Sequence, residues 1–373
     1  MYSISKLKKL VLTEFRSIDR GILYSALLLM FFGLFLTLAA GPAVAERRHY
    51  DWFYFVYKHL VFLPIGLVVL FITALFSVKT ARRLSFLTFV GAILGMVAVL
   101  IFGTNFQGAS RWISVAGISV QPSEFAKPAF AVVIAWFLAR SKLIYQSHGA
   151  WLAWGTWLIT VVLLKLQPDF GMILTITAIF GTELFLSGLP KWIIAILGFG
   201  AASLIPLAYL TMEHVRSRID TFLNPTDANA YQVKKSMETL ENAGWFGKGP
   251  GEGIVKFELP DAHTDFIMAV SAEEFGFLLS SVIVITFMFI VFKGSQLIRQ
   301  NNNYFVQLAV CGLLTQIAFQ AIVNLGSTLN LLPTKGMTLP LISYGGSSLV
   351  SMAFAFGLIL ALTKRQTFSR GLE

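Results

Sequence analysis

The sequence has little charge and almost no cysteine, and both shortages restrict what the protein can be. Charged residues make up 13% of the 373 residues, too few to cover a soluble domain whose composition is 56% hydrophobic. The single cysteine, Cys311, lies in an apolar run, so it supports neither a disulfide framework nor a metal site. Residues 1–20 are polar and the first apolar run is too long for a signal peptide, so we expect no cleaved leader.

Long apolar runs dominate the chain, whose mean hydropathy is +0.73. Each run has about 20 residues, the length that a helix needs to cross roughly 30 Å of hydrocarbon. The runs are continuously apolar rather than alternating, which favours helices over a membrane barrel. We therefore predict an all-α polytopic membrane protein with about ten transmembrane helices, near residues 21–43, 54–77, 86–104, 121–140, 149–166, 170–188, 190–211, 266–292, 305–329 and 341–363.

Basic residues flank alternate apolar runs, so the net charge of +10 indicates topology rather than a nucleic-acid surface. By the positive-inside rule, both termini are cytoplasmic. The expected organisation is a cytoplasmic tail (1–20), a transmembrane domain (21–363) with a large extracytoplasmic loop (212–265), and a cytoplasmic C-terminal tail (364–373). The length of that loop and its aromatic residues indicate a folded, functional element lying against the membrane.

Ionisable residues at membrane depth are costly and are therefore functional candidates. Glu124 and Lys127 lie three residues apart at the start of a span, so they share a helix face and form either a structural ion pair or part of a site. Asp169 either caps the sixth predicted span or faces the outer interface. Asp265 lies where the long loop enters the eighth span, in a run from Asp261 that is rich in proton-handling groups.

Asp265 is the predicted working centre, although Asp265 or Thr264 could simply cap the eighth span. His263 alone is more often a hydrogen-bonded interfacial residue than a base. The connection 324–348 contains two prolines, several glycines and Lys335. It suits a re-entrant segment whose free amides and lysine hold an anion such as pyrophosphate, or equally a tight structural turn.

Five motifs together resemble the signatures of the SEDS family, named for shape, elongation, division and sporulation. They are Gly108-Ala109-Ser110-Arg111-Trp112, Gln121-Pro122-Ser123-Glu124-Phe125-Ala126-Lys127, Gln167-Pro168-Asp169-Phe170-Gly171, His263-Thr264-Asp265-Phe266, and Pro333-Thr334-Lys335-Gly336 through Ser343-Tyr344-Gly345-Gly346-Ser347-Ser348. One motif is a weak signal, but five in order across about residues 20–365 are specific. The segments 332–340 and 249–253 resemble the division-specific FtsW type more than the elongation-specific RodA type. Ser119 departs from the pattern, because many division-type relatives carry a basic residue there.

The resemblance implies a peptidoglycan glycosyltransferase that polymerises lipid II on the outer face of the bacterial cytoplasmic (inner) membrane, at the division site. It also implies a class B penicillin-binding protein (a transpeptidase) and other divisome proteins as partners. Asp265 is then the general base, and the substrate-binding residues are Arg111, Trp112, Glu124, Lys127, Asp169, Arg218, His263, Lys335, Ser343 and Tyr344. Glu124 and Asp169 either orient other groups or bind a divalent cation, Mg²⁺ or Mn²⁺, although no dedicated metal motif is present. Two other functions stay open: a lipid II flippase, and a non-catalytic divisome scaffold.

Overall fold

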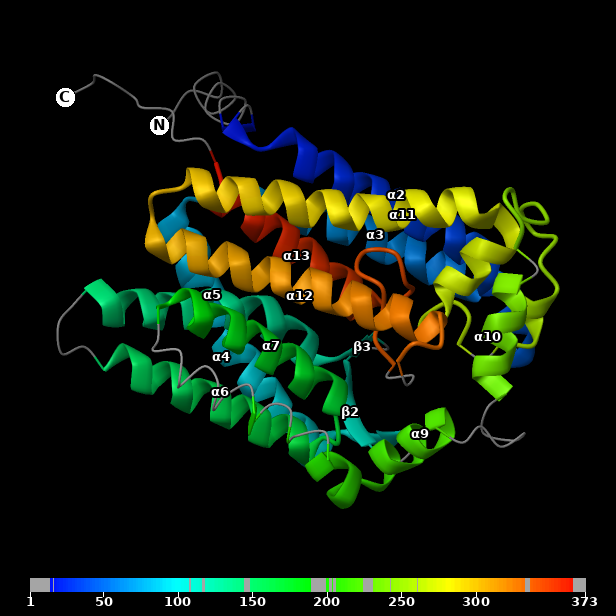
Figure 1. Cartoon of the computed structure of the whole chain (residues 1–373), viewed down its shortest axis with the longest axis horizontal. Helices are drawn as coiled ribbons and strands as arrows, with labels where there is room; N and C mark the ends of the chain where they lie inside the picture. The colour runs from blue at the N-terminus through cyan, green and yellow to red at the C-terminus, as the bar shows by residue number, and fades with distance from the viewer. Residues whose placement is uncertain are drawn as a thin grey trace.

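The computed structural model shows a bundle of long helices with a small sheet (Figure 1). It describes residues 14–15, 17–106, 109–115, 118–143, 148–188, 199–200, 203, 206–223, 231–241, 243–259, 261–332 and 336–364. The helices are α2 (Arg20–Arg47), α3 (Tyr54–Ala74), α4 (Val78–Phe102), α5 (Pro122–Leu143), α6 (Gly149–Leu166), α7 (Phe170–Leu186), α9 (Glu213–Leu223), α10 (Tyr231–Glu241), the 3-10 turn η1 (Val255–Phe257), α11 (Ile267–Gln300), α12 (Tyr304–Thr328) and α13 (Gly346–Leu362). The strands are β1 (Thr104–Phe106), β2 (Ala109–Val115) and β3 (Ile118–Val120).

Seven of the described helices are long and apolar enough to cross a membrane: α2, α3, α4, α5, α6, α11 and α12. The helices α7 and α13 are also apolar, with 17 residues each. The predicted fold class, an all-α polytopic membrane protein, is therefore confirmed. Most of the predicted span 190–211 lies outside the described residues.

Side-chain caps and burial explain where these helices begin and how they pack. Asp19, Ser77 and Asn303 each accept a hydrogen bond from the first turn of the helix that follows, α2, α4 and α12 respectively. The helix α13 is apolar on all sides and almost every one of its residues is buried, in contact with α3, α5 and α12. A helix that is apolar all round is stable only inside a bundle or in lipid, so α13 forms the centre of the core.

The two ends of the bundle differ in what they carry. The start of α2 and the end of α13 lie at the same end, where Lys364 Nζ is 2.7 Å from Glu14 Oε2 (Figure 1). The helices α9 and α10 lie at the opposite end, which we call the loop end. Both helices belong to the long stretch 212–265, so this stretch lies at the loop end of the bundle.

The helix α11 differs from the predicted continuous span 266–292, because it breaks at Gly276. This glycine has φ +75° and ψ −172°, which divides α11 into a short segment, 267–275, and a long one. A Cβ atom at Gly276 would lie 2.4 Å from the backbone nitrogen of Gly247. The break therefore depends on a glycine that both adopts a left-handed conformation and lets the turn 244–247 approach.

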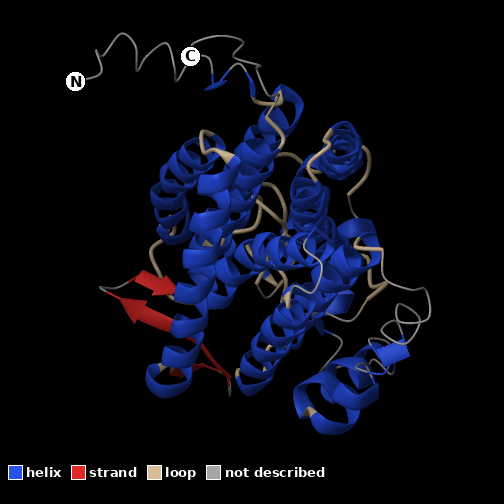
Figure 2. Cartoon of the chain, turned by 90° about the vertical axis from the view of Figure 1, so that its left-hand side faces the viewer, coloured by secondary structure: helices blue, strands red, loops and turns tan. Residues whose placement is uncertain are grey.

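A small antiparallel sheet between α4 and α5 was not predicted from the sequence. Its strand order is β1-β2-β3, with Thr104 opposite Trp112 and Ile113 opposite Val120. Figure 2 shows the strands at one side of the helices. The sheet matters for the site because β2 carries Arg111 and Trp112 and β3 leads directly into α5.

Candidate active site

A cavity of about 670 Å³ lies at the loop end, where the ends of several helices meet. Its wall comes from the starts of α3, α5 and α7, from β2 and β3, from the turn 261–265 and from the segment 336–348. Seven of the predicted site residues line it: Arg111, Trp112, Glu124, Asp169, His263, Asp265 and Tyr344. The fold therefore brings residues from all five sequence motifs into one wall, with the fifth motif represented by Gly336 and by Tyr344 and the residues after it.

Asp265 lies in this wall on a turn whose backbone is fixed by other segments. Three successive carbonyl oxygens of the turn each accept a hydrogen bond from α12 or from the connection that follows it. The bonds run from Tyr344 N to His263 O (2.9 Å), from Ser343 Oγ to Thr264 O (2.6 Å) and from Asn324 Nδ2 to Asp265 O (2.9 Å). The N-cap of α11 is Phe266, so Asp265 does not occupy the capping position.

Asp169 combines a capping role with a place in the cavity wall. Its Oδ1 accepts from the backbone N–H of Met172 at 3.2 Å, which caps α7. Its Oδ2 faces two donors, Gln121 Nε2 at 3.4 Å and Arg111 Nε at 3.8 Å. Arg111 also donates to the backbone carbonyls of Gln167 (3.2 Å) and Pro168. Arg111 therefore fastens β2 to the break between α6 and α7.

Glu124 and Lys127 form the predicted ion pair, with Lys127 Nζ 2.9 Å from Glu124 Oε2. Their side chains are 7% and 1% exposed, so the charges are almost fully withdrawn from water. Ser351 of α13 donates to the Glu124 carbonyl at 2.6 Å, which ties α5 to the central helix. Glu124 lines the cavity, whereas Lys127 is fully buried and holds its partner from within the bundle.

His263 is packed between aromatic rings rather than presented as a base. Its ring centroid lies 4.3 Å from that of Phe55 and 5.1 Å from that of Tyr344. Burial lowers the pKa of His263 to about 3, with a smaller contribution from the nearby Arg48 guanidinium. The imidazole is therefore neutral at physiological pH and is a weak proton acceptor.

The remaining predicted residues divide into one that supports the site and two that the structure does not place. Ser343 is buried and acts through the carbonyl of Thr264. Arg218 belongs to α9, but its side chain is not among those described. Lys335 lies outside the described residues.

Two cations in the cavity wall were missed by the sequence reasoning, Arg48 and Lys58. Arg48 Nη2 lies 2.7 Å from Asp261 Oδ1, and Lys58 Nζ donates to the Tyr54 hydroxyl at 2.5 Å. Both follow the first apolar run, in a connection that the positive-inside rule places outside, where few cations are expected. Their presence there is the sequence signal that could have identified them as site residues. With Arg111 they supply positive charge to a wall in which Ser119 stands where a basic residue was expected.

The protein residues of this cavity do not form a metal cage of their own. Glu124 and Asp169 were expected either to orient other groups or to bind Mg²⁺ or Mn²⁺, and in the structure they face Lys127 and Arg111. Within the described part of the chain, no three His, Cys, Asp or Glu side chains form a group that could hold a metal ion. The divalent cation therefore stays a prediction.

Comparison with known proteins gives one consistent result. Residues 19–367 match the family model for cell cycle proteins of the FtsW/RodA/SpoVE type. The chain is 38% identical over 357 residues to a probable peptidoglycan glycosyltransferase FtsW of Caulobacter vibrioides, covering 95% of this chain and 91% of the relative. It is 32% identical over 369 residues to the FtsW of Escherichia coli O6:H1, covering 95% and 89%.

Solved structures show the same fold. A chain from a peptidoglycan synthase complex that coordinates polymerization and crosslinking has a TM-score of 0.76 and 27% identity, covering 93% of this chain and 97% of that one. The rod shape determining protein RodA of Thermus thermophilus has a TM-score of 0.69 and 25% identity, covering 93% and 96%. Because the family model and these relatives span nearly the whole chain, the protein belongs to the FtsW/RodA/SpoVE family of cell cycle proteins.

Proposed function

We propose that this protein is a peptidoglycan glycosyltransferase of the FtsW type that polymerises lipid II during cell division. The family and the named relatives support the enzyme class. The observation that carries the assignment is Asp265, a carboxylate held in the wall of a cavity that also presents Arg48, Lys58 and Arg111. A base beside several cations suits a reaction in which a hydroxyl attacks and a pyrophosphate leaves.

In this reaction the 4-hydroxyl of an acceptor sugar attacks the anomeric carbon of the donor. A hydroxyl is a poor nucleophile at neutral pH, so Asp265 accepts its proton as the new glycosidic bond forms. The bond to the lipid pyrophosphate breaks in the same displacement, and the configuration inverts from α to β. A single inverting displacement needs no covalent enzyme intermediate, so one carboxylate in the role of base is sufficient.

The leaving pyrophosphate is stabilised by the cations of the wall. Arg111 is anchored by backbone carbonyls and presents a planar, permanently charged group. Lys58 bonds to a tyrosine hydroxyl, which leaves its full charge available to an anion. Lys127 is already paired with Glu124 and contributes through the orientation of that carboxylate. Arg218, Lys335 and a divalent cation carried by the phosphates are further proposed contributors.

The surrounding residues have supporting roles in this proposal. Asp169, which also accepts a hydrogen bond from the Gln121 side-chain amide, orients Arg111 toward the cavity. Trp112, which is 36% exposed, offers an indole face to a sugar ring. His263 and Tyr344 pack beside the base and limit the water around it.

The proposed topology places both termini in the cytoplasm and the cavity on the outer face of the inner membrane. The shared end of α2 and α13 and the excess of Lys and Arg in the tails support this orientation. The proposed partners are a class B penicillin-binding protein and other divisome proteins at the division site. The likeness to a chain of a peptidoglycan synthase complex supports the first of these.

Reconstitution with labelled lipid II tests the proposal directly. Wild-type protein, supplied with the penicillin-binding partner, is expected to yield long glycan strands on a gel, whereas Asp265→Ala and the isosteric Asp265→Asn yield none. Asp220→Asn, on the exposed surface pair of α9, is the matched control and retains polymerisation. Normal polymerisation by either Asp265 variant would overturn the assignment of the base. Translocated monomer without glycan would instead identify a flippase, and division without Asp265 would identify a scaffold.

A further inference from the structure

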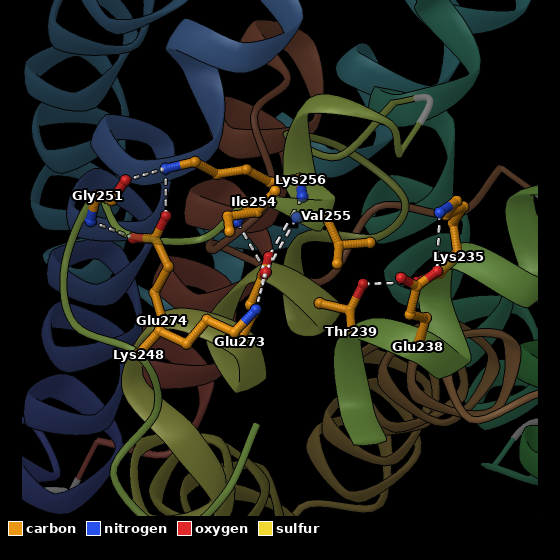
Figure 3. A network of polar contacts seen from close by, with 10 residues as sticks. All are labelled: Lys235, Glu238, Thr239, Lys248, Gly251, Ile254, Val255, Lys256, Glu273 and Glu274. Atoms are coloured by element: carbon orange, nitrogen blue, oxygen red, sulfur yellow. Dashed lines mark hydrogen bonds and ion pairs between the residues drawn. The ribbon is translucent and has the colours of Figure 1, made fainter. Parts of the chain in front are cut away.

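The glycine-rich segment of the long loop forms a strap, residues 247–257, that is fastened to α11 by two buried carboxylates (Figure 3). We call these carboxylates, Glu273 and Glu274, together with Lys248 and Lys256, the clamp. Neither carboxylate is exposed to solvent. Both lie in the short segment of α11 between Asp265 and the break at Gly276.

The Glu273 carboxylate is saturated by donors from the strap. Its Oε1 accepts from Lys248 Nζ at 3.2 Å and from two consecutive backbone N–H groups, Ile254 at 2.9 Å and Val255 at 3.0 Å. Its Oε2 accepts from the Lys256 N–H at 3.2 Å. A carboxylate that receives three backbone N–H bonds fixes the path of the backbone as well as the position of a side chain.

The Glu274 carboxylate holds the other edge of the strap. Its Oε2 accepts from the Gly251 N–H at 2.9 Å, and its Oε1 pairs closely with Lys256 Nζ, which also donates to the Gly251 carbonyl at 3.1 Å. A Cβ atom at Gly247 would lie 2.3 Å from the Glu274 carbonyl oxygen. The small residues of the run therefore let the strap lie directly on α11.

Backbone bonds close the chain into a loop whose neck is the clamp. The Lys248 N–H donates to the Glu273 carbonyl at 2.8 Å, and the Gly249 N–H donates to the Glu274 carbonyl at 3.0 Å. Residues 248–274 thus form a closed loop that contains Asp265. Arg47 of α2 holds the far side of this loop through the Phe257 carbonyl at 3.0 Å.

Stability alone does not account for such a clamp. Desolvating two carboxylates and the buried Lys256 costs several kcal/mol per ion, and buried ion pairs are often no more stabilising than well-packed apolar residues. What a fully bonded buried pair supplies is one defined arrangement of the chain. Here that arrangement fixes the strap against the first segment of α11, which begins at Ile267, two residues after Asp265.

We infer that Glu273 and Glu274 are positioning residues for Asp265, acting through the strap and the first segment of α11. This inference rests on the proposed role of Asp265 as the base. Displacing a reacting group by about 1 Å can cost on the order of 10²-fold in rate. The clamp therefore raises kcat. Lys58 and Arg111, the cations proposed to hold the phosphates, lie outside the closed loop, so KM is expected to stay constant when the clamp is lost.

The test uses full-length protein in the lipid II polymerisation assay, with kcat and KM measured separately. The double variant Glu274→Gln/Lys256→Gln removes a positive and a negative charge together, so it leaves no uncompensated buried ion. We expect kcat to fall about 10- to 100-fold, in line with the cost of a misplaced reacting group, with KM unchanged. Lys256→Arg keeps the pair and retains most of the activity. Arg216→Gln/Asp220→Asn removes an exposed pair on α9 and serves as the control.

Several results would overturn the inference. They are a folded double variant with wild-type kcat, a change confined to KM, or a loss in Lys256→Arg as large as in the double variant. If the double variant fails to fold, Glu273→Gln decides by the same criteria, because the amide keeps the size of the side chain and Lys248 is 32% exposed and can turn to water. Different results would overturn the proposed function itself. They are polymerisation by the Asp265→Asn variant, or no polymerisation by the wild-type protein.

Discussion

Replacing Lys127 by Met would separate the structural from the catalytic meaning of the buried ion pair. The substitution keeps an unbranched side chain that is one heavy atom shorter, but it leaves the Glu124 carboxylate, 7% exposed, without the ammonium that lies 2.9 Å away. Breaking a buried pair by removing one partner costs about 3–5 kcal/mol. Glu124 lies in the first turn of α5, where the helix dipole offsets about 0.3–1 kcal/mol. We therefore expect a loss of about 2–5 kcal/mol in the free energy of unfolding.

The double variant Lys127→Met/Glu124→Gln separates the effect of the ion pair on stability from its effect on activity. It removes both charges, so the unfolding free energy should return to within about 1 kcal/mol of the wild type. Polymerisation should nevertheless remain strongly reduced, because the cavity then lacks the carboxylate that Lys127 orients. Stability and activity would thus respond differently to the same pair of substitutions.

The assay measures thermal unfolding of detergent-purified protein and lipid II polymerisation side by side. A single Lys127→Met variant as stable as the wild type would refute the reasoning about buried charge. A double variant that recovers both stability and polymerisation would show that the pair is structural only. Restored stability with lost polymerisation is the expected outcome.

Two further predictions concern other residues of the wall. Because burial lowers the pKa of His263 to about 3, the unfolded chain binds a proton that the folded protein does not as pH falls below about 6.5. The contribution of the neutral His263 ring to the free energy of unfolding is therefore fully present above about pH 6.5. It falls as the pH drops toward about 3, by up to about 1.4 kcal/mol per pH unit. His263→Phe should flatten the pH dependence of the melting temperature, and an unchanged slope would contradict this account. Arg111→Lys loses the fork that bridges the Gln167 and Pro168 carbonyls, and should lower kcat/KM about tenfold, equivalent to about 1.4 kcal/mol; unimpaired steady-state kinetics would argue against that anchoring role.

The features predicted well from the sequence are those set by short-range patterns. Apolar length predicts a spanning helix because lipid thickness is fixed, and the spacing of Glu124 and Lys127 predicts a pair because three residues return a helix to the same face. Asp169 does cap α7, as one interpretation had it, while its second oxygen faces the site. For that residue, capping and a place in the site are compatible rather than alternative.

What the sequence could not predict depends on contacts between distant segments. Arg48 and Lys58 enter the cavity wall only because α2 ends and α3 begins beside the turn 261–265. The break at Gly276 requires the turn at Gly247 to pack against it, and no local sequence pattern predicts that contact. The three short strands lack the alternating run that would have indicated them, and they form because they pair with one another.

The hydrogen bonds to the turn 263–265 have a consequence for how this site can change. All three are accepted by main-chain oxygens, so these bonds depend on the course of the backbone and not on which side chains the turn carries. An exchange of the Asp265 side chain therefore leaves all three of these bonds available to hold the turn. Placement and chemistry are encoded in different parts of the chain, and the chemistry can be altered one residue at a time.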